Sequence, residues 1–391
     1  MKLEYSDGKI TLTKGVFIKR TAILPLTAAV KITVRQTPLL RIFRAKEVTV
    51  FTHRGKLELF LNKTEQPPFL PVMPSLGIKP RFREILFGAL IDTRALAGIA
   101  FFAAVLQRIG RIIGSSYFER IISALFSTAE KLSETLLMIH VAVPTIAAFA
   151  AVFAAFSWIF AFLTKLIKLS GFRLSRRGKF VYIKSGVFTL YETALVQNTA
   201  AVITRRTMIC MLFGRSPVYY SKTMVYPAAS EKLFERILVK LFGITPESAA
   251  PVKTPPSGTA AHCIVPLCVF GISTALLILF YFSRLSSAKL LKTVLYCAVF
   301  AGGYIALCGM ILMKNAESSF GKHRVRLSYR RGTAVYCACF PREIERGSVL
   351  SQSIFLRSKG LFDYKALVSG RKSFRARRLP IGSLQDRVGK H

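Results

Sequence analysis

The sequence predicts a membrane protein in which apolar helical segments alternate with small antiparallel β-domains. Of its 391 residues, 52% are hydrophobic, and the mean hydropathy is +0.42, which is typical of an integral membrane protein. Residues 1–84, 165–254 and 314–391 contain 16, 15 and 18 basic residues against 6, 4 and 5 acidic ones. Residues 85–164 and 255–313 are nearly neutral and contain the longest apolar runs. Composition and charge distribution are thus two observations that predict this fold class, and an internal repeat is the third.

Residues 1–66 are predicted to form the first β-domain. Apolar and polar residues alternate around Ile10 and again in residues 31–34 and 47–52, which is the period of half-buried strands. Asp7-Gly8 indicates a hairpin turn, because this pair tolerates the positive φ angles of a type I′ turn. Residues 67–84 contain five prolines, which exclude a helix or a central strand and predict an extended linker.

The block 85–164 is predicted to contain a pair of membrane spans joined by an amphipathic loop. Leu136–Thr164 has no charged residue and is long enough for one tilted crossing. Ile85–Leu106 is predicted to be the other span although it contains Asp92 and Arg94, and a re-entrant or interfacial helix is the alternative. A second crossing is needed if the basic domains on both sides of this block face the cytoplasm.

Residues 165–244 are predicted to form a second β-domain that repeats the first. Residues 10–17 match residues 181–188, and residues 39–43 match residues 209–213 after a one-residue slip. In both copies of the first match a glycine follows a run of period two, as expected at a hairpin turn.

The rest of the chain continues this alternation. Residues 231–243 predict a short amphipathic helix that ends at Gly243. Residues 245–261 are a second proline-rich linker, and 262–313 predict a transmembrane hairpin with a short basic loop. Residues 314–391 are predicted to be a third, degenerate copy, in which the spacing Gln352-x-x-x-x-Arg357 repeats that of Gln36-x-x-x-x-Arg41.

These segments resemble the bacterial PH-like, membrane-flanked domain family, in particular its multi-copy YdbT-like members. The resemblance is carried by Lys14-Gly15-Val16-Phe17 with Gln36 to Phe43, by Ser185-Gly186-Val187-Phe188 with Arg206 to Arg215, and by Ser351-Gln352 to Gly360-Leu361. The resemblance lies in the order of these segments and extends over nearly the whole chain. It implies membrane α-helical hairpins combined with α+β or all-β PH-like split-barrel domains, each with two antiparallel sheets closed by a helix. It also implies a multi-pass protein of the bacterial inner (plasma) membrane with cytoplasmic domains and no catalytic activity.

The sequence gives little support for an enzyme. The five histidines are scattered, Cys337-x-Cys339 lacks further ligands at metal spacing, and no glycine-rich phosphate loop is present. We therefore predict no catalytic residues, metal or cofactor. A small transporter or permease built from the four spans is the alternative function, in which Asp92 and Arg94 mark a transport path.

The candidate functional residues are basic residues next to the spans, which either contact anionic lipid headgroups or only orient the chain in the membrane. The expected partners are the lipid bilayer and its anionic headgroups, with a protein partner or a second copy of the chain also open. Nucleic acid is not expected, because the charge follows the spans. The candidate membrane-surface residues are Arg81, Arg83, Lys165, Lys168, Arg173, Arg176, Arg177, Lys179, Lys314, Lys322, Arg324 and Arg326.

Overall fold

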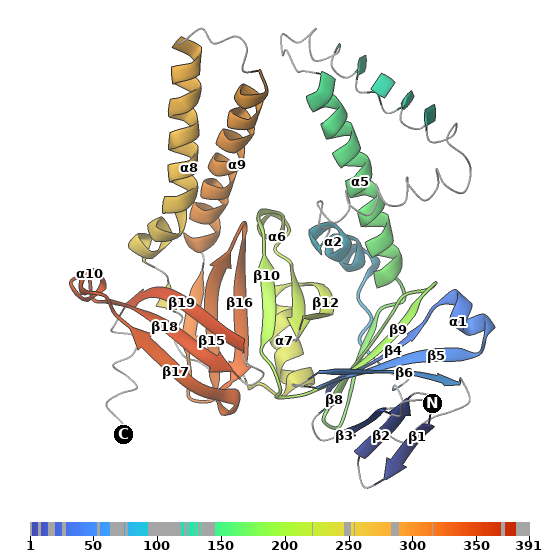
Figure 1. The fold of residues 1–391 in the computed structure, drawn as a ribbon. Helices are drawn as coiled ribbons and strands as arrows, with labels where there is room; N and C mark the ends of the chain where they lie inside the picture. The colour runs from blue at the N-terminus through green and yellow to red at the C-terminus, as the bar shows by residue number, and fades with distance from the viewer. Residues whose placement is uncertain are drawn as a thin grey trace.

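The computed structural model shows a mixed α+β fold (Figure 1). It describes residues 2–92, 145–282 and 289–380, together with scattered residues between 119 and 134. The shorter segments outside the description are 7–8, 15–19, 26–28, 53–54, 63–73, 75–76, 221, 246–251, 254, 315 and 369–371. Within the described residues the strands form four antiparallel sheets, from which the long helices project on one side (Figure 1).

The described strands fall into three units, each with two consecutive groups of three strands. Unit 1 (residues 2–62) contains β1 (Lys2–Ser6), β2 (Lys9–Lys14), β3 (Arg20–Pro25), β4 (Ala29–Gln36), β5 (Ala45–Thr52) and β6 (Lys56–Asn62). Unit 2 (residues 173–242) contains β7 (Arg173–Arg177), β8 (Phe180–Ser185), β9 (Leu190–Val196), β10 (Val202–Arg206), β11 (Ser216–Tyr220) and β12 (Thr223–Ala229). Unit 3 (residues 317–380) contains β14 (Glu317–Phe320), β15 (Arg324–Arg331), β16 (Ala334–Pro341), β17 (Glu345–Ser351), β18 (Leu361–Val368) and β19 (Lys372–Pro380).

Neighbouring units share sheets. The second strand group of unit 1 joins the first group of unit 2 through β4 and β9, which gives the order β6-β5-β4-β9-β8-β7. The second group of unit 2 joins the first group of unit 3 through β10 and β16, and β13 (Val252–Lys253) completes a seven-stranded sheet. Edge strands expose unpaired backbone groups, and these junctions pair four of them inside the chain.

Each unit has a short helix at the same place, between the first two strands of its second group. These helices are α1 (Pro38–Ile42), α6 (Met208–Phe213) and α10 (Ile354–Arg357). Each is capped by a hydroxyl group: Thr37, Thr207 and Ser353 accept the backbone N–H of the residue three positions later. The structure therefore places the matched segments 39–43 and 209–213, and the fainter match near Arg357, at equivalent positions.

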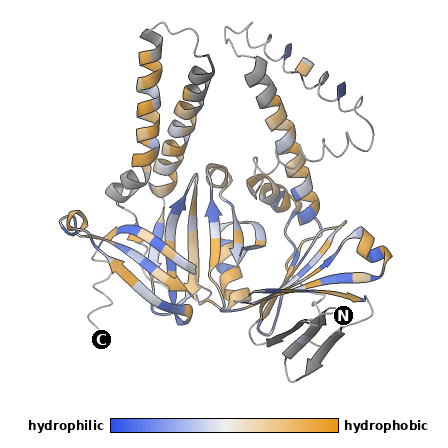
Figure 2. Ribbon diagram, in the orientation of Figure 1, coloured by the Kyte–Doolittle hydropathy of each residue, from blue (hydrophilic) through white to orange (hydrophobic). Residues whose placement is uncertain are grey.

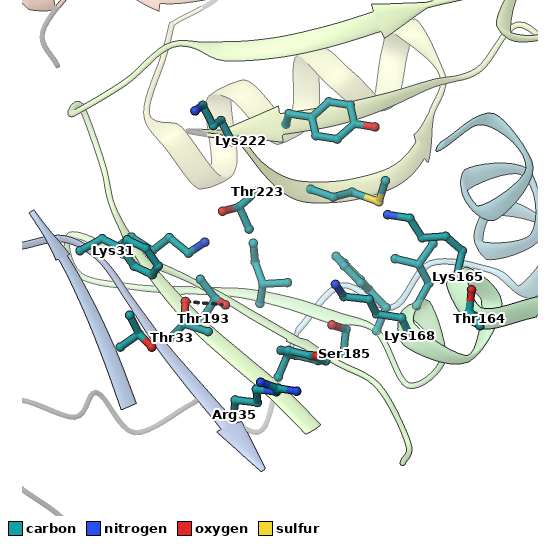
Figure 3. Close-up of a pocket in the computed structure, with 18 of the residues that line it drawn as sticks. Lys31, Thr33, Arg35, Thr164, Lys165, Lys168, Ser185, Thr193, Lys222 and Thr223 are labelled. Atoms are coloured by element: carbon teal, nitrogen blue, oxygen red, sulfur yellow. Dashed lines mark hydrogen bonds between the residues drawn. The ribbon is translucent and has the colours of Figure 1, made fainter. Parts of the chain in front are cut away.

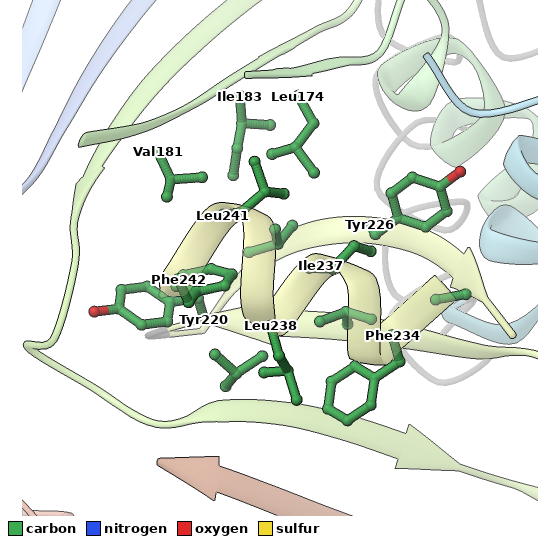
Figure 4. Close-up of a cluster of buried hydrophobic side chains, with 14 of the residues drawn as sticks. Leu174, Val181, Ile183, Tyr220, Tyr226, Phe234, Ile237, Leu238, Leu241 and Phe242 are labelled. Carbon is green, nitrogen blue, oxygen red and sulfur yellow. The ribbon is translucent and has the colours of Figure 1, made fainter. Parts of the chain in front are cut away.

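The largest core lies in unit 2, around helix α7 (Glu231–Phe242). The hydroxyl group of Ser230 caps the start of α7, and Gly243, with a φ of 68°, ends it. The predicted helix and its stop are thus confirmed. Its buried face packs against side chains from both strand groups of unit 2, as Figure 4 shows; this face consists of Phe234, Ile237, Leu238, Leu241 and Phe242.

Helix α2 (Phe82–Asp92) packs on β12 of unit 2. Its Ala89 is fully buried in the unit 2 core, and Gly88 lies so close to Pro227 that a Cβ atom at this position would collide with it. The predicted span 85–106 therefore begins inside a helix that packs on a sheet, and its residues 93–106 lie outside the described part of the chain. The predicted linker ends earlier than expected, because Ile78 already pairs with Leu174 and α2 begins at Phe82.

Three long helices leave the sheets on one side: α5 (Thr145–Leu169), α8 (Pro256–Phe282) and α9 (Lys289–Lys314). Their residues are mostly apolar, whereas apolar and polar residues alternate along the strands (Figure 2). Among the described residues, one helix is long and apolar enough to cross a membrane, through Val152–Leu169 of α5. The helices α8 and α9 pack together as the predicted hairpin, with shorter apolar stretches at Cys263–Leu279 and Ala298–Lys314. Four spans are therefore not supported.

The predicted boundaries of the span 136–164 need correction. Helix α5 begins at Thr145 and continues to Leu169, while residues 136–144 lie outside the described part of the chain. Because they are charged, Lys165 and Lys168 are predicted to follow the span. They instead form the last turns of the same helix, where lysine side chains interact favourably with the helix dipole.

Candidate functional site

A cleft of about 750 Å³ lies between the end of α5, the six-stranded sheet and the β11–β12 hairpin. It is lined by five cationic side chains, Lys31, Arg35, Lys165, Lys168 and Lys222, and by one carboxylate, Glu47. Figure 3 shows these lysines approaching the cleft from different elements. The cleft exists because units 1 and 2 share a sheet: its floor comes from both units.

The floor is formed by alternating residues of β4, β5 and β9. Along β4, Ile32 faces the core of unit 1, whereas Lys31 and Thr33 face the cleft. The hydroxyl groups of Thr33 and Thr193 lie 3.5 Å apart across the β4–β9 junction. A strand alternates its faces, so the same strand supplies both a hydrophobic core and a polar floor.

Two of the lysines lie over aromatic rings of the cleft. The ammonium group of Lys168 lies 5.0 Å from the ring centre of Tyr191, and that of Lys31 lies 5.0 Å from the ring centre of Phe51. Such cation–π contacts position a charged group without neutralising it.

The floor of the cleft brings cationic side chains close to one another. Burial, and secondly the charge of Lys168, lower the pKa of Lys31 below its ordinary value of 10.5. The carboxylate of Glu47 lies 3.4 Å from the guanidinium of Arg35. A bound anion would offset the repulsion between the cations.

The roof of the cleft adds a cation and a hydroxyl group from the β11–β12 hairpin. Lys222 lies in this turn with a φ of 68°. The hydroxyl oxygen of Thr223 is buried and has no hydrogen-bond partner in the structure. Buried polar groups without a partner are uncommon.

The structure brings only two of the twelve predicted basic residues, Lys165 and Lys168, into the cleft. Arg173 is exposed at the start of β7, while Arg176, Arg177 and Lys179 are exposed around the β7–β8 turn at the other end of that strand. Arg176 donates to the backbone carbonyl of Lys240 at 2.9 Å and so ties the turn to α7. Arg81 and Arg83 are exposed at the start of α2.

The four basic residues predicted after the last hairpin also separate. Lys314 is exposed at the end of α9, and Lys322 is exposed in the turn after β14. Arg324 is 7% exposed and pairs with Glu235 at 2.7 Å, and Arg326 pairs with Glu231 at 2.7 Å. These pairs join α7 of unit 2 to β15 of unit 3.

Sequence reasoning missed Lys31, Arg35 and Lys222. The alternation in residues 31–34 predicts a half-buried strand, and Lys31 lies among its polar residues. A polar strand face usually faces solvent, and nothing in the sequence showed that the end of α5 would cover it.

Among the described residues, no three His, Cys, Asp or Glu side chains come together to hold a metal ion. Comparison of the chain with protein-family models, curated proteins and solved structures finds no match. The site is therefore interpreted from its own chemistry, which is that of a cationic cleft beside an apolar helix.

Proposed function

We propose that the protein is a non-enzymatic membrane scaffold whose cleft binds the anionic headgroup of a lipid. One observation carries the proposal: only 17% of the apolar stretch Val152–Leu169 of α5 is buried, and the last turns of this helix supply Lys165 and Lys168 to a cleft with three further cations. In a bilayer, the acyl chains of a lipid would lie along α5 while its headgroup reached the cleft. The sheets would then lie at the cytoplasmic side, where basic residues meet anionic lipids.

The exposed surfaces of the long helices support membrane anchoring. Phe156, Ile159 and Leu163 of α5 are each 47% exposed, and Val265 of α8 and Phe300 of α9 are more than 70% exposed. Apolar surfaces of this extent need a membrane or a partner to cover them.

The sheet that units 1 and 2 share restricts the membrane topologies that are compatible with this proposal. Because β4 pairs with β9, units 1 and 2 lie on the same side of the membrane. A single crossing by α5 would separate them, so the proposal requires an even number of crossings between β6 and β7. Reporter fusions after Lys63 and after Arg177 test this requirement. Opposite sides for these two reporters would exclude it.

The three units suit the PH-like resemblance. Unit 2 has two three-stranded groups and the closing helix α7, which packs between them. We propose that units 1 and 3 are further copies of this split barrel, arranged so that each lends a strand group to a common sheet. In this arrangement the units act as one rigid adaptor along the membrane.

Binding of a short-chain phosphatidylglycerol to the full chain in a neutral detergent tests the headgroup site. Phosphatidylcholine of the same chain length and inorganic phosphate form the other arms of the titration. We expect Lys168→Gln to weaken phosphatidylglycerol binding about fivefold, since a basic residue near an anionic headgroup contributes about 1 kcal/mol.

Lys179→Gln is the matched control, because it removes an exposed lysine outside the cleft. Equal binding of the two lipids, or an equal loss in the control variant, would exclude the headgroup site. Tight binding of inorganic phosphate with no preference between the two lipids would identify a soluble anion as the ligand.

A further inference from the structure

Five large apolar side chains are exposed together where unit 1 meets the β8–β9 turn of unit 2. In α1 and directly after it, Leu39, Ile42 and Phe43 are 67%, 74% and 76% exposed. In the turn, Val187 and Phe188 are 57% and 64% exposed. We call these five residues the rim patch. Neither the headgroup cleft nor a described core accounts for them.

The rim patch lies at the end of α5. The backbone N–H of Gly186 donates to the carbonyl of Ser170, the residue directly after α5, at 2.7 Å. The guanidinium of Arg41 in α1 donates to the carbonyl of Val187 at 3.2 Å and ties the two halves of the patch together. The patch therefore sits at the level at which α5 would leave a membrane.

We propose that the rim patch inserts into the interfacial layer of an anionic bilayer. This proposal rests on the membrane anchoring proposed above, but not on the headgroup site. The patch combines apolar side chains with two arginines, Arg41 and Arg44, and residues of these two kinds favour the boundary between headgroups and acyl chains.

The repetition of the short helices favours a planar partner over a second copy of the chain. Helix α10 of unit 3 exposes Ile354 and Phe355 by 86% and 83%, and α6 exposes Leu212 by 82%. All three helices lie toward the side from which the long helices leave (Figure 1). A two-fold dimer closes over one self-complementary patch, whereas a bilayer can cover three patches spread along one side.

Tryptophan fluorescence can measure the depth of the rim patch, because the chain contains only one tryptophan. That residue, Trp158, lies in α5 and is 37% exposed. In a Trp158→Phe background of the full chain, one new tryptophan is introduced by Phe43→Trp, by Phe188→Trp or by Lys179→Trp. Each variant is reconstituted into phosphatidylcholine–phosphatidylglycerol vesicles with acyl chains brominated near the headgroups, which quench nearby tryptophans.

Lys179→Trp is the matched control. Phe188 and Lys179 flank opposite ends of β8 and are separated by about 20 Å at 3.3 Å per residue. We expect bromolipid to quench the tryptophans of Phe43→Trp and Phe188→Trp several-fold more strongly than that of Lys179→Trp. Equal, weak quenching at all three positions would overturn the proposal.

The outcomes also separate this proposal from the proposed function. Trp158 lies 11 residues before the end of α5, about 16 Å along the helix, so it is measured in the unaltered chain with lipids brominated near the ends of their acyl chains. If these lipids do not quench Trp158, the membrane anchoring itself fails. If Trp158 is quenched but the rim tryptophans are not, only the insertion fails. A blue-shifted emission without bromine quenching at the rim would show that a second copy of the chain covers the patch.

Discussion

Removal of the Glu84 carboxylate should loosen helix α2 from unit 2. Glu84 is 8% exposed. It accepts hydrogen bonds from the hydroxyl of Tyr226 at 2.6 Å, from the guanidinium of Arg215 at 2.9 Å and from the backbone N–H of Arg81 at 3.0 Å. Breaking a buried ion pair by removing one partner costs about 3–5 kcal/mol. The Arg215 side chain is 31% exposed and can regain water, so we expect Glu84→Ala to cost about 3 kcal/mol.

For folded domains of about 150–250 residues, a loss of about 3 kcal/mol corresponds to a fall of about 6–12 °C in the melting temperature. Near-ultraviolet circular dichroism of the full chain in detergent measures it, because tyrosines lie in the affected core. Glu84→Gln keeps an acceptor for Tyr226, so its melting temperature should lie between those of the unaltered chain and of Glu84→Ala. Glu58→Ala removes an exposed carboxylate that pairs with Lys56 on β6 and should leave the melting temperature unchanged. A shift for Glu84→Ala no larger than that of Glu58→Ala would refute the reasoning.

The other predictions concern the cleft, the core and the hairpin. Burial and the charge of Lys168 lower the pKa of Lys31 in the folded chain, so the charged form of Lys31 opposes folding. The free energy of unfolding should therefore rise as the pH increases from the pKa of Lys31 in the folded chain toward 10.5. Lys31→Met should therefore raise the melting temperature at pH 7 but weaken phosphatidylglycerol binding in titration calorimetry. If the melting temperature and the affinity both rose, or both fell, the result would contradict this prediction. Ile237→Ala leaves a cavity in the unit 2 core and should cost about 2–5 kcal/mol in thermal unfolding, whereas a cost near zero would mean that α7 is not packed as described. A Cβ atom at Gly309 would collide with the guanidinium of Arg330, which donates to the Ile305 carbonyl at 2.7 Å. Gly309→Leu should therefore displace Arg330, and cross-linking between α9 and β15 that matches the unaltered chain would argue against this close approach.

The local elements were the most predictable part of the fold. Strands β5 and β6 of unit 1 alternate in burial as the period-two pattern predicts, and β1 and β2 pair on either side of the predicted Asp7-Gly8 turn. Helix α7 and its stop at Gly243 follow from amphipathic spacing and a glycine that tolerates a positive φ. These features depend on neighbouring residues in the chain, so local physics is enough to specify them.

The pairing between units could not be predicted, because alternation fixes which face of a strand is buried but not which strand lies beside it. The junction of β4 with β9 therefore remained hidden, and with it the cleft. The same limit explains Arg324 and Arg326: their proximity to a span suggested a lipid contact, but Glu231 and Glu235, far away in sequence, take up their charges. Lys165 and Lys168 were chosen because they directly follow the predicted span, and the structure places them in the last turns of α5.

The shared sheet also has a consequence during synthesis of the chain. Thr33 on β4 and Thr193 on β9 are 160 residues apart, so at about 5–20 residues per second a ribosome needs about 8–30 s to make the partner of β4. During this interval β4 exposes an unpaired edge, to which another nascent chain could add. Charged residues on edge strands oppose such pairing, and Lys31 and Arg35 lie on this one. The cations that later line the cleft would thus protect the unfinished protein from aggregation.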